Sequence, residues 1–409
     1  MDYTRRIADV VLETSAATAD IVVLAGVRGA GVTTTALRHA GDVVDAAVPA
    51  QAQAFATGGV GPDARFPLLI DEFTHIPDVA THLADARAAH PGARFLLTTS
   101  LEVPEYQTIR MRPESFVERN LADPTVSLGA LAAQRDLAIE GESAVGLAGY
   151  VDQILCSGLP GVRALDPRRR PAALRAYLAE AASSDLARAQ MTPRRPDTVL
   201  AWIAALARAS SHTTPLTQVH RLLGRSLASR DTVTAWRDAL TQTMLLDPVP
   251  AWMPTGPDAP GRLTSSPRLY LADPALAAAA CQITSRHLLR GQTAPVQPVE
   301  GTWLAALFSS LVTMSVRTYA EAHGWNVSHL RTKRGTHDIP LIIELDGSRV
   351  LAGAITTSPD PSDRDTADLT WLADTMPRKV AGTFVITTGP AAYRRDDGVA
   401  IIPLALLAP

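Results

Sequence analysis

Hydrophobic and polar residues alternate with two different periods along the first third of the chain. Three short apolar runs predict buried strands: residues 21–25, 66–71 and 94–98. Helical spacing of apolar residues follows at residues 33–39 and 78–90. Strands that alternate with helices favour a parallel, doubly wound sheet. We therefore predict an α/β domain over residues 1–125.

The pattern changes twice further along the chain. In residues 126–295 the apolar residues mostly recur at helical spacing, as at 171–182 and 198–209. One short strand is predicted there, at 268–272. Residues 296–409 begin with a helix predicted at 302–323. Four predicted strands follow it: residues 339–345, 349–356, 382–387 and 399–403. A helical middle region and a small mixed α/β domain are therefore expected after the first domain.

A glycine-rich loop follows the first predicted strand directly. It reads Gly26-Val27-Arg28-Gly29-Ala30-Gly31-Val32-Thr33-Thr34, the phosphate-loop (Walker A) pattern with valine in the lysine position. Such a loop binds phosphate through backbone N–H groups and the start of the next helix. The candidate nucleotide-binding residues are Gly26, Arg28, Gly29, Gly31, Val32, Thr33 and Thr34.

Val32 removes the positive charge that normally reaches the β- and γ-phosphates. A charge-assisted hydrogen bond is worth roughly 1.5–3 kcal/mol, so its loss predicts about ten- to a hundred-fold weaker binding. The chain contains only two lysines, Lys333 and Lys379, so no lysine of the first domain replaces it. Arg28 within the loop has the reach to act as a substitute cation.

Acidic residues end the second predicted strand, as in a Walker B motif. Asp71 and Thr33 would hold Mg²⁺, and Glu72 is the candidate catalytic residue, which would orient the attacking water. The alternative is that the two acids only cap the sheet edge. Hydroxyls end the third predicted strand, which makes Thr98 and Ser100 candidate sensors of the γ-phosphate. ATP and Mg²⁺ are the cofactors that this arrangement predicts.

In their order along nearly the whole chain, these motifs resemble a family of bacterial predicted ATPases. That family has an AAA-type P-loop core, a helical and winged-helix middle, and a C-terminal domain that resembles the PD-(D/E)XK nuclease fold. Besides the loop, the matching stretches are Tyr3-Thr4-Arg5-Arg6-Ile7-Ala8-Asp9, Leu69-Ile70-Asp71-Glu72, Met111-Arg112-Pro113-Glu114-Ser115-Phe116-Val117-Glu118, Gly158-Leu159-Pro160, Ser184-Asp185-Leu186, Ala272-Asp273-Pro274-Ala275-Leu276 and Val385-Ile386 onward to Tyr393-Arg394-Arg395.

The resemblance also implies catalytic groups that this sequence lacks. Val32 occupies the position at which the family has the loop lysine. Residues 101–110 contain no Gly-Arg pair that would serve as an arginine sensor. The family's nuclease positions hold Ser309, Pro340, Ala354 and Thr356, with Asp338 and Glu344 nearby. Such a nuclease needs acids and a lysine to hold Mg²⁺ and activate water. The resemblance therefore implies a degenerate ATPase homologue, or pseudoenzyme, without nuclease activity.

Residues 214–246 resemble a winged helix, with Asp231 expected to cap a second helix that runs to Leu246. Four arginines there could contact DNA phosphates: Arg221, Arg225, Arg230 and Arg237. Three acids reduce the positive charge of this segment: Asp231, Asp238 and Asp247. The sequence therefore favours a segment that packs within the protein and does not bind DNA.

Composition narrows the functional classes only a little. The 409-residue chain has a net charge of −3, so no strong nucleic-acid footprint is expected at whole-chain level. Two cysteines and the absence of long apolar runs or a signal-like start predict a cytoplasmic protein that binds no membrane. Three functions stay open: a degenerate ATPase homologue that acts through an unknown protein partner, a slow ATPase aided by Arg28 or a partner's arginine, and a winged-helix DNA-binding regulator.

Overall fold

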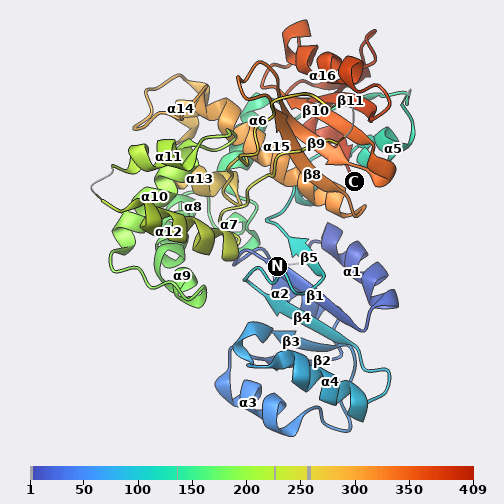
Figure 1. Cartoon of the computed structure of the whole chain (residues 1–409), viewed down its shortest axis with the longest axis vertical. Coiled ribbons are helices and arrows are strands. Elements are labelled where there is room, and N and C mark those ends of the chain that lie inside the picture. Colours follow the sequence, from blue (N-terminus) through green and yellow to red (C-terminus); the bar gives the residue numbers. More distant parts are fainter. Residues whose placement is uncertain (1–2, 136, 225–226, 256–258) are drawn as a thin grey trace. The chain divides into compact units, whose positions relative to one another are not determined.

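The computed structural model of the protein describes residues 3–135, 137–224, 227–255 and 259–409 (Figure 1). Its contacts divide the chain into two compact units. The first unit is Met1–Pro113 with Gln242–Met244, and the second unit is Glu114–Thr241 with Leu245–Pro409. The domain boundaries after residues 125 and 295 stay predictions.

The first unit contains a five-stranded sheet in the order β2-β3-β4-β1-β5, in which all neighbouring strands are parallel. This confirms the predicted parallel sheet. The strands are β1 Ile21–Gly26, β2 Asp42–Asp45, β3 Leu68–Asp71, β4 Phe95–Thr99 and β5 Thr108–Met111. The helices are α1 Ile7–Thr18, α2 Val32–Leu37, α3 Pro49–Gly58 and α4 Val79–Ala89, and a short 3-10 helix covers Phe73–His75.

Successive residues of the central strands point to opposite faces of this sheet, as a two-residue period requires. In β1, Val22 and Leu24 pack in one apolar cluster with residues of α1 and α2. Val23 packs in a second cluster, which includes residues of α3 and α4. Helices therefore cover both faces. Because β1, β3 and β4 are parallel, the residues that follow their carboxyl ends meet at one edge of the sheet.

Helices form the middle of the second unit. Their bounds are α5 Leu128–Ala133, α6 Leu147–Cys156, α7 Pro160–Arg163, α8 Arg170–Glu180, α9 Leu186–Arg188, α10 Pro196–Arg208, α11 Leu216–Leu223, α12 Arg230–Gln242, α13 Pro274–Ala280 and α14 Ser285–Leu289. Between α8 and α9 the chain forms a π-helical turn at Ala181–Asp185. The helix predicted at 171–182 is therefore α8 and the beginning of this turn.

A seven-stranded mixed sheet, in the order β7-β12-β13-β11-β10-β9-β8, forms the rest of the second unit. The strands are β7 Gly141–Glu142, β8 Asn326–Arg331, β9 Asp338–Glu344, β10 Val350–Ile355, β11 Val380–Thr387, β12 Ala391–Arg394 and β13 Ala400–Pro403. Two helices of this region are α15 Trp303–Glu321 and α16 Asp363–Thr375. The strands β8, β9 and β10 are antiparallel neighbours, whereas β10 and β11 are parallel and are joined through α16 (Figure 1).

Two short strands from the middle of the sequence join the C-terminal strands. β7 pairs with β12, and β6 (Val126–Ser127) pairs with β14 (Leu407–Ala408). Two residues of pairing are too short to show a hydrophobic period, so the sequence pattern does not indicate them.

Two local predictions in the middle region are wrong. Residues 268–272 form no regular strand but isolated bridges, in which Arg268 pairs with Val249 and Leu269 with Ser210. No continuous ladder forms because successive residues pair with different segments. Asp231 does not cap α12, because the hydroxyl of Ser229 accepts the hydrogen bond from the N–H of Thr232, and α12 ends at Gln242.

Candidate functional site

The glycine loop has backbone conformations that favour glycine. The chain leaves β1 at Gly26 and makes a turn closed by a hydrogen bond from Ala30 N to Val27 O, of 3.0 Å. Gly29 and Gly31 have φ values of 80° and 98°, in the left-handed region that other residues avoid. A Cβ atom at Gly26 would lie 2.4 Å from a backbone carbonyl oxygen of β5. The three glycines of the pattern therefore each have a structural reason.

Val32 begins α2 and lies against apolar residues. It packs at the edge of the cluster that contains Leu12 and Leu24. Its Cγ2 atom is 2.8 Å from the position of a Cβ atom at Gly26, so its side chain covers the backbone of the loop. The side chain supplies packing and no charge. A lysine could keep the same packing with its methylene stem, because long cationic side chains lie along apolar surfaces.

The candidate Mg²⁺ residues and one candidate sensor contact one another. The hydroxyl of Thr33 donates a hydrogen bond to Asp71 Oδ1, at 2.8 Å. The hydroxyl of Thr98 donates to the same oxygen and accepts the hydrogen bond of the Glu72 N–H, at 3.0 Å. The loop, β3 and β4 therefore meet at Asp71, with hydroxyl and carboxylate oxygens of the kind that Mg²⁺ prefers.

Glu72 is held in an unusual backbone conformation. Its φ is 52°, a left-handed value that is uncommon for a residue with a side chain. The Ser100 hydroxyl donates to its carboxylate, at 2.9 Å from Oε1. Such backbone outliers occur most often at functional sites, where the surrounding structure holds them in place. Glu72 and Ser100 therefore lie together, as Asp71 and Thr98 do.

The remaining candidates of the loop lie nearer the surface. Gly29, Thr33 and Thr34 are exposed, and Arg28 is half-buried. A ligand could therefore reach the loop from the side on which Thr33 is exposed. These features fit a Mg²⁺–nucleotide, since the chain has no room for a Cβ atom at Gly26 and the oxygens of Thr33 and Asp71 lie beside the loop.

The N-terminal segment supports α2, a role that the sequence did not indicate. Asp9, only 2% exposed, accepts hydrogen bonds from the Tyr3 hydroxyl and pairs with the His39 ring, both at 2.7 Å. Burial alone would raise the pKa of Asp9, but the hydrogen bonds from His39, Tyr3 and the Arg6 backbone hold it below its ordinary value. Burial raises the pKa of Tyr3 to about 12. Asp9 therefore stays ionised and Tyr3 neutral.

The positions at which the resemblance implies nuclease groups lie in apolar or structural surroundings. Gly353 of β10 pairs with Leu341 of β9, and Ala354 and Pro340 are the next residues of the two strands beyond this pair. Ala354 packs against the apolar cluster under α16. Ser309 is 8% exposed, with its hydroxyl 3.4 Å from that of Tyr270. The hydroxyl of Thr356 accepts the Ser358 N–H at 3.2 Å.

The two acids near these positions have structural partners. Asp338 forms ion pairs with Arg268 and with Arg331, the latter at 2.7 Å. Glu344 accepts a hydrogen bond from the Ser328 hydroxyl at 2.6 Å. Among the described residues, no group of three or more His, Cys, Asp and Glu side chains could hold a metal ion. Asp338 and Glu344 therefore both take part in the polar contacts of the sheet.

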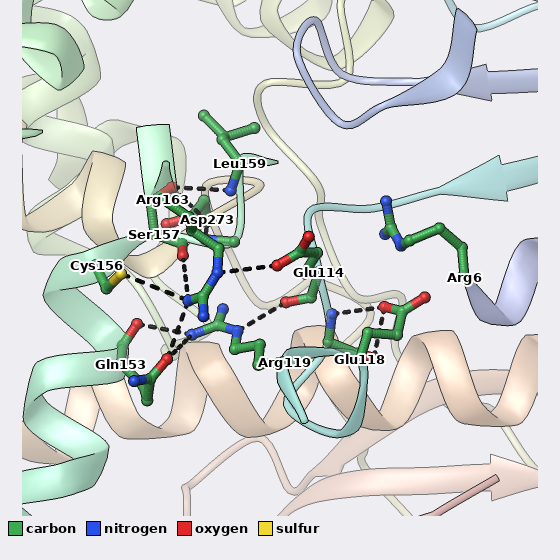
Figure 2. Close-up of polar contacts among 12 residues, drawn as sticks. Arg6, Glu114, Glu118, Arg119, Gln153, Cys156, Ser157, Leu159, Arg163 and Asp273 are labelled. Carbon is green, nitrogen blue, oxygen red and sulfur yellow. Dashed lines mark hydrogen bonds and ion pairs between the residues drawn. The ribbon is translucent and has the colours of Figure 1, made fainter. Parts of the chain in front are cut away.

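Three of the sequence motifs meet in one buried polar network of the second unit (Figure 2). The Glu114 N–H donates to Gly158 O at 2.7 Å, and the Gly158 N–H donates to the carboxylate of Asp273. Glu114 also forms an ion pair with Arg163, at 2.9 Å. Asp273 is fully buried and caps α13 by accepting the Ala275 N–H at 2.7 Å. These motifs therefore have a structural role.

Arg119 lies at the centre of the same network. It donates from Nε to Glu114 O at 3.1 Å and from Nη1 to Gln153 O at 2.7 Å, as Figure 2 shows. Burial lowers its pKa to about 10, which still leaves it charged at neutral pH. A buried charge held mainly by backbone carbonyls fixes the positions of the segments that supply them.

The arginines of the predicted winged helix do not form one exposed group. Arg221 and Arg230 are exposed, whereas Arg237 is half-buried and pairs with Asp238 at 2.6 Å. Arg225 lies outside the described residues. The ion pair of Arg237 leaves little charge at that position for a phosphate.

Comparisons with known proteins match only part of the chain. Residues 148–287, less than half of it, match a domain of unknown function, DUF8612. No curated protein matches. A Walker-type ATPase of Pyrococcus abyssi is among the similar solved structures, with a TM-score of 0.41, 13% sequence identity, and coverage of 68% of this chain and 96% of that one. A likeness at this level does not bear on activity.

No helix in the described ranges is both long enough and apolar enough to span a membrane.

Proposed function

We propose that this protein binds a Mg²⁺–nucleoside triphosphate weakly at its glycine loop and acts through binding to a partner instead of through rapid hydrolysis. One observation carries the proposal. The oxygens of Thr33, Asp71 and Thr98 are joined by hydrogen bonds at the end of the loop, whereas the neighbouring Val32 is apolar. The site keeps the groups that hold a metal ion and has lost a cation that stabilises phosphate.

Each residue has a defined part in this proposal. The N–H groups of Gly29 and of residues 31–33 would bind the phosphates, and Thr33 and Asp71 would hold Mg²⁺, which neutralises phosphate charge. Glu72, held by Ser100, is placed to orient a water molecule. Without the lysine, the site stabilises phosphate less in the bound state and in the transition state. Slow turnover is the expected consequence.

A titration of the wild type and of Val32→Lys with MgATP tests the proposal. We expect about ten- to a hundred-fold tighter binding by Val32→Lys, because one charge-assisted hydrogen bond is worth roughly 1.5–3 kcal/mol. Val32→Met is the matched control, since it has a similar stem without the charge. It should bind MgATP as the wild type does.

Three outcomes distinguish the alternatives. Equal affinities of Val32→Lys and Val32→Met, or no binding by either, would overturn nucleotide binding at this loop. Hydrolysis of MgATP by the wild type at an ordinary enzymatic rate, abolished by Glu72→Gln, would replace the proposal by a working ATPase. Binding without such hydrolysis supports the proposal.

A further inference from the structure

Arg6 reaches the back of the glycine loop from the N-terminal segment. It is 5% exposed and immediately precedes α1. Its Nη1 atom donates a hydrogen bond to Ala30 O, and its Nη2 atom donates to Arg112 O, both at 2.8 Å. One guanidinium therefore joins the loop to the segment that follows β5. All three residues belong to the first unit.

We infer that Arg6 is the positioning residue of the loop and couples it to the end of the first unit. The inference rests on the proposed function, because it assigns a purpose to the loop's conformation. Arg6 acts on the loop through the peptide bond between Ala30 and Gly31. In a trans peptide, the C=O and N–H bonds point to opposite sides. By holding Ala30 O at the back of the loop, Arg6 turns the N–H of Gly31 to the other side.

The loop needs such an anchor because its own sequence is flexible. Gly29 and Gly31 flank Ala30, and glycine has few conformational restrictions, so the intervening peptide planes turn easily. Ala30 is fully buried, and a buried carbonyl without a partner destabilises the fold. Arg6 meets both needs, since it satisfies this carbonyl and fixes the plane of its peptide. Its forked guanidinium is suited to binding two acceptors at once.

The position of Arg6 is itself fixed by the start of α1. The Arg6 N–H donates to Asp9 Oδ2 at 2.6 Å, in a capping arrangement. Asp9 is held in turn by Tyr3 and His39. The backbone that carries the guanidinium therefore has little freedom to move with the loop.

The second acceptor extends the effect of Arg6 beyond the loop. Arg112 is the penultimate residue of the first unit's main segment, which ends at Pro113. A ligand that orders the loop would strengthen the hydrogen bond to Ala30 O and, through the same guanidinium, order residues 111–113. By linkage, order in that segment would raise the affinity of the loop. Residues 111–113 would thus report whether the loop is occupied.

Hydrogen exchange and MgATP binding, measured together, test this inference. The variants are Arg6→Lys, which keeps the charge but loses the fork, and Arg6→Met, which loses both. Arg5→Met is the matched control, because Arg5 is an exposed neighbour that pairs with Glu13 at the surface. We expect at least ten-fold faster exchange in residues 29–33 and 111–112 for Arg6→Met, and an intermediate increase for Arg6→Lys. MgATP affinity should fall about ten-fold in Arg6→Met.

The outcomes separate this inference from the proposed function. If the wild type does not bind MgATP, the proposed function fails, while exchange in the two segments still tests the anchor. If Arg6→Met and Arg6→Lys exchange like Arg5→Met in both segments, the anchor is overturned. Should Arg6→Met not fold, Arg6→Lys decides. The coupling itself requires that MgATP protect residues 111–112 in the wild type and not in Arg6→Lys, and equal protection in the two would overturn it.

Discussion

The glycine loop of the first unit and the β9–β10 strand pair of the second unit differ in what their chemistry depends on. The loop lacks one charged side chain, but its glycines keep their conformations, and Thr33 and Asp71 stay in contact. At the strand pair, Pro340 and Ala354 stand where the resemblance implies acids. A phosphate loop binds largely through backbone groups, so it tolerates one lost side chain. A metal site made of side chains loses its ligands when those side chains are replaced.

The difference also appears in what the remaining acids do. In the first unit, Asp71 and Glu72 accept hydrogen bonds from hydroxyls that a metal ion or a water molecule could replace. In the second unit, Asp338 is engaged by the guanidinium groups of Arg268 and Arg331. An acid with two cationic partners is part of the structure, and releasing it would leave both arginines without their partner. Asp338 therefore has a structural role in the second unit.

The largest effect we predict is a loss of stability of the second unit in acid. His329 is fully buried, and burial lowers its pKa from 6.5 to about 4. Between these values the unfolded chain binds a proton that the folded chain does not, so stability is full above pH 6.5 and falls toward pH 4. The shift corresponds to about 3 kcal/mol at pH 4. Burial also lowers the pKa of His212, in the same direction.

Tryptophan fluorescence measures this effect on the second unit alone. All six tryptophans of the chain lie after residue 200, in the second unit: Trp202, Trp236, Trp252, Trp303, Trp325 and Trp371. Urea unfolding at pH 7 and pH 4.5 should show the loss in the wild type and a smaller loss in His329→Gln. His75→Gln, at an exposed position of the first unit, should behave as the wild type does. An equal loss in His329→Gln would contradict the prediction.

The next largest effect we predict is a loss of stability when an acid is placed at the β9–β10 strand pair. Ala354→Glu places a carboxyl group against the apolar cluster under α16, which we expect to destabilise the second unit by roughly 1–3 kcal/mol. Mg²⁺ should not recover the loss, because Pro340, where the resemblance implies the second acid, offers no ligand. Urea unfolding followed by tryptophan fluorescence, with and without Mg²⁺, checks both expectations.

Ala354→Gln is the matched control, since an amide has the same size and no charge. Stabilisation of Ala354→Glu by Mg²⁺, without an effect on Ala354→Gln, would show that the strand pair keeps a ligand arrangement. The contrast between the two units would then be one of degree.

The sequence predicted the elements whose signals are local. β1, β3 and β4 are short apolar runs that end at glycine, acid or hydroxyl residues, so their type and the polar residues at their carboxyl ends are readable from neighbouring positions. Pro67 precedes β3, which therefore begins at Leu68 instead of at residue 66. The hydroxyl residues at the end of the predicted strand made Thr98 and Ser100 candidate sensors, and the structure places them in contact with Asp71 and Glu72.

What the sequence did not indicate are contacts between distant residues. Arg6 meets Arg112 across more than a hundred positions, and β7 meets β12 across more than two hundred. A single arginine in an N-terminal segment has no pattern that predicts a buried carbonyl as its partner. The left-handed backbone of Glu72 was equally unreadable, because that conformation depends on the surrounding fold.

The smallest effect we predict tests whether the Thr98 contacts maintain the arrangement of the first unit. Thr98→Val keeps the shape of this buried residue but removes the hydroxyl that accepts the Glu72 N–H and donates to Asp71. We expect the first unit to lose about 1–2 kcal/mol, since each of the two hydrogen bonds is usually worth about 1 kcal/mol. Hydrogen exchange at the Glu72 amide should then be roughly five-fold faster, since 1.4 kcal/mol corresponds to ten-fold.

Ser100→Ala is the control for this measurement, because the Ser100 hydroxyl binds the carboxylate of Glu72 and not its amide. Exchange at the Glu72 amide should stay unchanged in that variant. If Thr98→Val also leaves this amide unchanged, the hydroxyl does not hold β3 and β4 in register at the site. The contacts around Asp71 would then be incidental, and the two units would not differ in how their acids are held, in spite of the intact glycines of the first.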